Sequence, residues 1–87
     1  MAILTEAERM ALPNSAFALE ARRAFPIMDK DHAEAALMDA PLSLRAGHIT
    51  PAQKEYIDAC AHEVLRTGKP LAELRAEGWK PTQDSAA

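Results

Sequence analysis

One short stretch, ITPAQ at residues 49–53, constrains the fold more than any other part of the chain. Thr50 can accept a hydrogen bond from a free N–H group in the first turn of a helix, and Gln53 can complete the reciprocal capping box. Pro51 stands at the first helical position, where its missing N–H costs nothing. The stretch therefore predicts that a helix begins at Pro51.

The end of this helix is also marked. Gly68 is typical of the residue that follows a helix, and Pro70 prevents its continuation. Apolar residues between these signals recur at helical spacing and form one stripe. The stripe consists of Ile57, Cys60, Ala61, Val64 and Leu65. We expect a helix over residues 51–66 that buries this face, with Cys60 as a buried and unreactive thiol.

A second main helix is predicted over residues 30–39. Asp29 or Asp31 can cap its first turn, where the helix dipole also favours negative charge. One apolar face is formed by Ala33, Ala36, Leu37 and Ala40. Pro41 is expected to end the helix, although one more turn before Gly47 stays open.

Short helices are predicted towards both ends of the chain. Thr5 and Glu8 form a capping box for a helix from Glu6 to Ala11, which should stop before the next proline. Another short helix is predicted over residues 70–77. The chain then becomes polar, and we expect the tail, residues 81–87, to be mobile.

Residues 13–28 show no helical periodicity. Apolar residues here are spaced mostly by two: Phe17, Leu19, Phe25 and Ile27. We interpret the segment as an extended arm that lays these side chains on a core built elsewhere. A short edge strand is the alternative, but no partner strand is evident. The sequence thus predicts an all-α fold, a single small helical domain over residues 1–80 with two main antiparallel helices, short flanking helices and an extended N-terminal arm.

Composition excludes several classes of protein. The 87 residues carry a formal net charge of −3 and a pI of about 5.5, whereas a nucleic-acid binder presents a basic face. A single cysteine excludes an internal disulfide, and a reducing compartment fits. No apolar run approaches the ~20 residues of a membrane span, and no secretory signal is recognisable. We therefore expect neither nucleic acid nor a membrane as partner.

The most obvious cluster of chemical side chains is Asp29, Asp31 and His32. A metal site needs three or four convergent ligands, and the other histidines, His48 and His62, are predicted on a loop and on a wet helix face. We interpret the aspartates as helix caps and His32 as a side chain that packs within the first turn. The sequence predicts no metal, no cofactor and no catalytic residue.

Two arginines and a tryptophan are the remaining candidates. Arg22 and Arg23, next to Phe25, could contact phosphate. Given the acidic balance of the chain, we favour a solvated arm in which one arginine is tied to a helix C-terminus or a carboxylate. Trp79 is interpreted as closing the core over the last helix, with an exposed anchor for a partner as the alternative.

The stretches LPNSAFA and RAFPIMDKDHAEAAL resemble a small, uncharacterised module of bacteriophage and prophage proteins. Its pattern is L-P-x-S-x-F-A, a variable gap, R-x-aromatic-P-I-x-D-x-x-H, an Ala/Leu-rich helix and a Ser/Thr-Pro-capped helix. The matching residues are Leu12, Pro13, Ser15, Phe17, Ala18, Arg23, Phe25, Pro26, Ile27, Asp29, His32, Ala36 and Leu37. The resemblance covers about residues 12–68. The gap is short here, and the second helix and the tail are acidic or mixed where many relatives are rich in Lys and Arg.

The resemblance implies a phage origin and a structural or assembly role. We expect a non-enzymatic virion protein, assembled in the host cytoplasm and attached to the major capsid protein or the connector, with a homo-oligomer or multi-copy assembly open. The expected partner contacts are Phe17, Arg22, Arg23, Phe25, Ile27 and Trp79. The expected structural residues are Asp29, His32 and Thr50, with His32 pinning the arm to the helix. The alternative is a regulatory or packaging module that contacts DNA through Arg22, Arg23 and Arg45.

Overall fold

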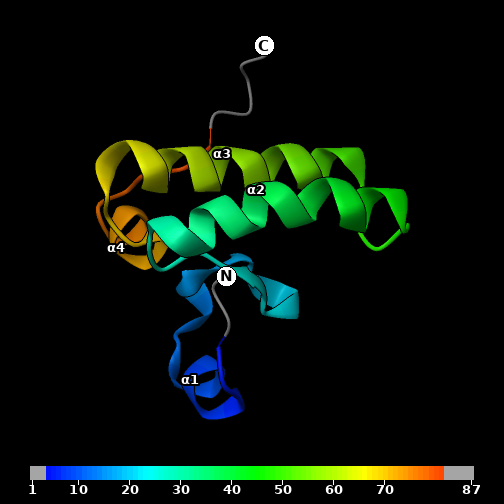
Figure 1. The fold of residues 1–87 in the computed structure, drawn as a ribbon. Helices are drawn as coiled ribbons and strands as arrows, with labels where there is room; N and C mark the ends of the chain where they lie inside the picture. Colours follow the sequence, from blue (N-terminus) through cyan, green and yellow to red (C-terminus); the bar gives the residue numbers. More distant parts are fainter. Residues whose placement is uncertain (1–3, 82–87) are drawn as a thin grey trace.

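The computed structural model describes residues 4–81, and its main layer is a pair of long helices. Helix α2 (Lys30–Arg45) and helix α3 (Pro51–Thr67) run antiparallel, side by side (Figure 1). Their buried residues are mostly small: Ala33, Ala36 and Ala40 from α2, with Ile57, Cys60, Ala61 and Val64 from α3. Small side chains allow the two backbones to approach closely, which compensates for the few aromatic residues.

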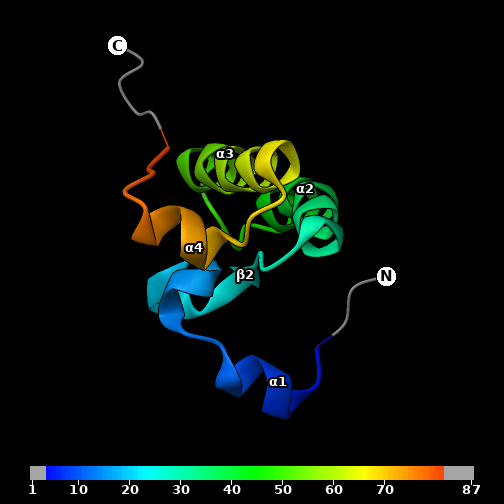
Figure 2. The ribbon, with the colours of Figure 1, turned by 90° about the vertical axis from the view of Figure 1, so that its left-hand side faces the viewer.

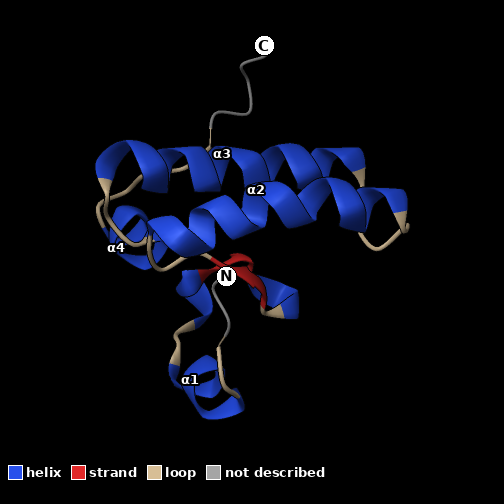
Figure 3. Cartoon of the chain, viewed as in Figure 1, coloured by secondary structure: helices blue, strands red, loops and turns tan. Residues whose placement is uncertain are grey.

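A small β-hairpin lies against this helix pair, so the prediction of a purely α fold was wrong in this part. Strand β1 (Phe17–Leu19) pairs antiparallel with strand β2 (Ala24–Pro26), and Figure 3 shows the two short strands below the helix pair. In the strand register, Phe17 lies opposite Pro26. The 3₁₀ turns η1 (Asn14–Ala16) and η2 (Glu20–Arg22) precede the two strands. The partner strand that the sequence did not reveal comes from the same arm. The fold is therefore mostly α with one two-stranded sheet.

The hairpin nevertheless does what was expected of the arm, because it lays apolar side chains on the helices. Ile27 and Ala18 are 0% and 3% exposed and belong to the core between hairpin and helices. The backbone N–H of Leu71 donates a 3.0 Å hydrogen bond to the carbonyl of Ile27, which joins the end of the hairpin to α4. Strand pairing supplies the backbone hydrogen bonds that an extended arm would have left unmet.

Helix α2 runs through Pro41, so the prediction that it ends at residue 39 was also wrong. Pro41 is exposed, and water can reach the backbone around it. The added turn contains Leu44, which packs against the core. That burial, together with the hydrogen bonds of the last turn, offsets the roughly 3 kcal/mol that a proline costs inside a helix.

The predicted caps of α2 and α3 are confirmed, and the end of α3 lies one residue beyond the predicted one. Thr50 caps α3 and forms the expected box with Gln53, and Gly68 ends the helix with a φ of 77°, in the left-handed region. Asp29 caps α2: its carboxylate accepts a hydrogen bond from the backbone N–H of His32. These contacts satisfy N–H groups that a helix terminus otherwise leaves free.

Two short helices complete the fold. Helix α1 (Glu6–Ala11) has the predicted bounds and capping box, buries no residue and stands away from the helix pair (Figures 1 and 2). Helix α4 (Leu71–Ala76) is one residue shorter at each end than the predicted helix over 70–77. It buries Leu71 and Leu74 against the core. Apart from Pro81, the predicted mobile tail lies outside the described residues.

Candidate functional site

Arg75 of α4 ties the hairpin to the helices. Its guanidinium donates to three backbone carbonyl oxygens, those of Ser15 (2.8 Å), Phe17 (2.7 Å) and Ala18 (3.2 Å). It also donates to the Tyr56 hydroxyl at 2.9 Å and lies 3.4 Å from the Glu20 carboxylate. The side chain is only 14% exposed. An arginine held in this way is structural, because binding an external ligand would require breaking these bonds.

A second cluster joins α1 to the hairpin around the ring of Phe17. The guanidinium carbons of Arg9 and Arg23 lie 5.2 and 4.6 Å from the ring centroid, at cation–π distance. Arg23 also donates to the Asn14 side chain at 2.6 Å. The carbonyl oxygens of Arg9 and Leu12, at the end of α1, accept from Arg23 at 2.8 and 3.2 Å. This confirms the interpretation that one arginine of the arm is tied to a helix C-terminus.

Arg22, the other arginine considered for phosphate contact, is also engaged. Its guanidinium donates a 2.8 Å hydrogen bond to the backbone carbonyl of His48, in the connection between α2 and α3. The bond fastens the tip of the hairpin to this connection. Both arginines therefore bind backbone carbonyls of the chain itself.

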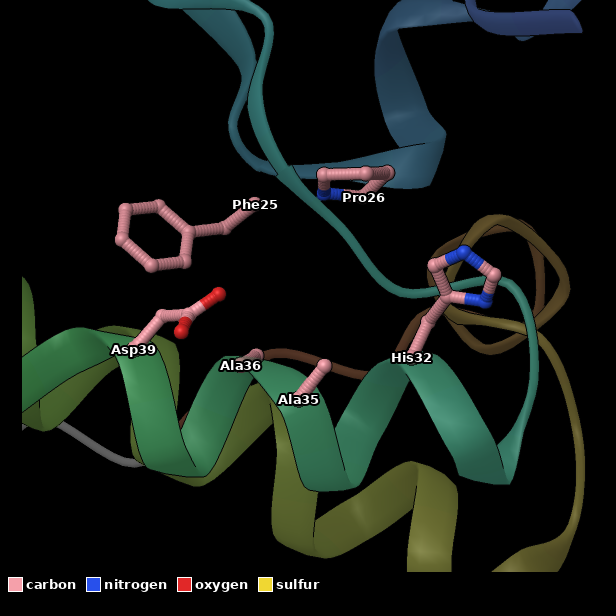
Figure 4. Close-up of a pocket in the computed structure, with 6 residues that line it drawn as sticks. All are labelled: Phe25, Pro26, His32, Ala35, Ala36 and Asp39. Carbon is pink, nitrogen blue, oxygen red and sulfur yellow. The ribbon is translucent and has the colours of Figure 1, made fainter. Parts of the chain in front are cut away.

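His32 borders a small pocket between β2 and α2 (Figure 4), and its side chain is 13% exposed. The pocket has a volume of about 80 Å³ and is lined by Phe25, Pro26, His32, Ala35, Ala36 and Asp39. Figure 4 shows the Phe25 ring and the Asp39 carboxylate at one end and the imidazole at the other. Ligand pockets usually measure roughly 300–1,000 Å³. This pocket has room for water or a small ion rather than for an organic substrate.

Asp29 orients the imidazole. The ring Nδ1 lies 2.7 Å from the Asp29 carboxylate, which also caps the helix. Burial raises the pKa of Asp29, but the hydrogen bonds and charge of His32 outweigh burial and leave this pKa below its ordinary value of 3.8. An ionised carboxylate only accepts, so Nδ1 carries a proton. Nε2 is buried and makes no hydrogen bond within residues 4–81. His32 thus packs between hairpin and helix, where it was expected.

Phe25 forms one wall of the pocket in an unusual conformation. Its φ is 62°, in the left-handed region that a bulky aromatic residue rarely adopts, and Arg23 at the hairpin turn has a φ of 50°. The hairpin contacts described above hold both residues in place. Both conformations lie in a region that costs free energy for residues other than glycine, and they flank the start of β2.

The four apolar residues among the predicted partner contacts divide into two groups. Phe17 and Ile27 are 0% exposed, so a partner could reach them only after the hairpin is displaced. Phe25 and Trp79 are partly buried and pack against the core, as the favoured interpretation of Trp79 required. Their remaining surface is accessible.

Sequence reasoning missed three large apolar side chains that are exposed in the described part of the chain. Met10, Met38 and Leu42 are 71%, 72% and 58% exposed, respectively. The signal was present for α2, because Met38 and Leu42 lie four residues apart on the side opposite its alanine face. It was overlooked because the helix was predicted to end before Leu42.

Cys60 is fully buried beneath the hairpin and helices. Burial raises the pKa of its thiol to about 11, an effect that the nearby Arg75 reduces only in part. At neutral pH the group is a thiol rather than a thiolate, and the thiol is the unreactive form.

Within residues 4–81, no three His, Cys, Asp or Glu side chains gather in a way that could hold a metal ion. None of the helices in this part of the chain has the length and apolar character needed to cross a membrane. Comparison of the chain with protein-family models, with curated proteins and with solved structures gives no match.

Proposed function

We propose that this chain is a small, non-enzymatic structural protein of a phage virion, attached to the capsid or its connector through protein–protein contacts. The motif resemblance over residues 12–68 supports the phage setting. The observation that carries the contact role is the position of α1, which projects from the body and buries no residue of its own.

Within residues 4–81, arginine contacts hold helix α1 near its C-terminal end. The contacts of Arg9 and Arg23 around Phe17 fix it to the hairpin. Met10, on the same helix, is 71% exposed. A fixed, projecting helix with an exposed methionine has the features of a binding element, because methionine adapts its shape to an apolar partner surface.

Met10 and the accessible parts of Phe25 and Trp79 are the contacts that we propose for the phage partner. Aromatic residues and methionine are enriched in the centres of protein interfaces. Phe17 and Ile27 take the supporting role, because they hold the hairpin in the shape that presents Phe25.

The alternative, contact with DNA, keeps little support. Arg22 and Arg23 donate to backbone carbonyls, which leaves the exposed Arg45 as the one of these three arginines whose guanidinium has no such bond within residues 4–81. A net charge of −3 opposes approach to a polyanion. If the DNA alternative held, binding to duplex DNA would be measurable at low salt and would fall steeply as salt is raised.

The test is quantitative mass spectrometry of phage particles purified on a density gradient from cells that express this chain. We expect a constant ratio of the chain to the major capsid protein. The variant Met10→Glu should lower that ratio, and Met10→Leu should not, because it preserves the apolar side chain. If the chain is abundant in the lysate but absent from purified particles, the proposed virion role is contradicted.

A further inference from the structure

The side of α2 that faces away from α3 carries an exposed apolar stripe. Met38 is 72% and Leu42 58% exposed, and the half-buried Ala35 precedes Met38 by one turn. Spacings of three and four residues place them on one line along the helix, as in the seam between paired helices. Figure 2 shows the helix pair nearly end-on, with no described element over this side of α2. We call Ala35, Met38 and Leu42 the α2 stripe.

Charges of opposite sign lie at the two ends of the α2 stripe. Asp31 precedes Met38 by seven residues and Arg45 follows it by seven, and both are exposed. Seven residues are nearly two helical turns, so the two charges lie on the same side as Met38, roughly 21 Å apart along the axis. None of the ion pairs within residues 4–81 uses either charge. Both are available to another molecule.

We propose that the α2 stripe is the contact surface of a symmetric dimer, in which two copies of α2 pack antiparallel about a two-fold axis at Met38. Because Asp31 and Arg45 are equidistant from Met38, each copy places its aspartate opposite the arginine of the other. A parallel arrangement would instead bring like charges together. Antiparallel packing also aligns the two helix dipoles favourably. Because the charges at the two ends of the α2 stripe are opposite, two antiparallel copies of it are complementary. We therefore assign a second copy of this chain as its partner.

The interface is small. One helix face from each copy lies below the roughly 800 Å² per partner of a standard interface, so we expect weak association that populates the dimer at high protein concentration. Many copies held close together in one assembly would meet that condition. The inference rests on α2 and not on the proposed function. If the chain dimerises in solution but is absent from phage particles, the dimer proposal stands and the proposed virion role is contradicted.

The first test is sedimentation velocity of the full chain over concentrations from low micromolar to millimolar. We expect a monomer at the lower end and a reversible dimer at the upper end. Met38→Glu places two carboxylates at the centre of the interface and should weaken association at least tenfold. Met10→Glu is the matched control, because it makes the same change at an equally exposed methionine on α1, and it should leave self-association unchanged.

A charge exchange tests the antiparallel register. Asp31→Arg alone brings two positive ends together, and Arg45→Asp alone brings two negative ends together, so each variant should dimerise more weakly than the natural chain. A mixture of the two variants restores both opposite-charge pairs and should form a heterodimer. The substituted side chains are exposed, so we expect every variant to fold. Circular dichroism checks that each one does.

Three outcomes of these two experiments would overturn the proposal. They are a monomer at every concentration, self-association that Met38→Glu does not weaken, and single charge variants whose mixture associates no better than either alone. A monomer that binds an isolated phage structural protein through Met38 would assign the stripe to that partner and would likewise overturn the dimer.

Discussion

The guanidinium of Arg75 donates a 2.7 Å hydrogen bond to the backbone carbonyl of Phe17, which joins α4 to the first strand of the hairpin across 58 positions of sequence. Phe17 in turn lies beneath the guanidinium groups of Arg9 and Arg23. Contacts therefore run from α4 through the hairpin to α1. The elements that surround the helix pair are held by arginines and backbone carbonyls as much as by apolar burial.

We expect Arg75→Ala to lower the free energy of unfolding by roughly 2–4 kcal/mol, because it leaves buried carbonyls without donors. Arg75→Lys should recover only part of this, since an ammonium group cannot reproduce the planar fork. Urea denaturation followed by circular dichroism measures the effect. Arg66→Ala is the control: that arginine is 70% exposed and, within residues 4–81, pairs with Glu63 alone, so stability should hardly change. Equal effects at the two positions would contradict the role of Arg75.

Pro41→Ala should stabilise the protein by about 1–2 kcal/mol. The alanine restores a backbone N–H inside α2 and removes the ring clash, and part of this gain is offset because the unfolded chain becomes more flexible. Thermal unfolding provides the measurement. Pro51→Ala, at the first position of α3, serves as the comparison and should bring no such gain. A loss of stability at position 41 would show that the proline is required where it stands.

Cys60 should resist alkylation in the folded protein. Its pKa of about 11 and its complete burial leave almost no accessible thiolate at pH 8. We expect iodoacetamide to modify the thiol rapidly in denaturant and very slowly without it, as followed by intact mass. Rapid modification of the folded chain would mean that the hairpin opens readily from the helix pair.

Asp29 should make folding sensitive to acid. Burial raises the pKa of Asp29, but the hydrogen bonds and charge of His32 lower it by a larger amount. The pKa in the folded protein therefore lies below the ordinary 3.8. As the pH falls through about 3.8, the unfolded chain takes up the proton first, and stability present above this pH is lost below it. Asp29→Asn should remove this part of the acid dependence in unfolding curves between about pH 5 and 2. The same change at Asp31, which makes no described ion pair, should preserve the acid dependence.

Helix ends were predictable wherever a cap was formed by neighbouring residues. The capping boxes at Thr5 and Thr50 and the left-handed Gly68 involve atoms only a few positions apart, so the local sequence contains all their determinants. The same reasoning gave the wrong end for α2, because the free-energy cost of Pro41 inside the helix is outweighed by contacts of the following turn with the core. Local signals predict an element reliably only when no tertiary contact opposes them.

Side-chain contacts of the candidate site were likewise predictable only where the interacting residues are close in sequence. The association of Asp29 with His32 could be read from their three-residue spacing at a helix start. The role of Arg75 could not, because its partners are backbone atoms of distant residues and backbone carbonyls leave no mark in a sequence. The sequence predicted that Phe17 packs on the core, but not that the guanidinium groups of Arg9 and Arg23 lie over its ring.

By itself, the sequence determined where the main helices begin, which faces of α2 and α3 are apolar, and that the segment between α1 and α2 is not α-helical. These properties follow from capping chemistry and hydrophobic periodicity, which act over a few residues. Only the tertiary structure decided that this segment pairs with itself as a hairpin, that α2 continues through Pro41, and that Met38 and Leu42 remain exposed. Each depends on which distant surfaces meet, and the free energy of such contacts is available only once the chain has closed on itself.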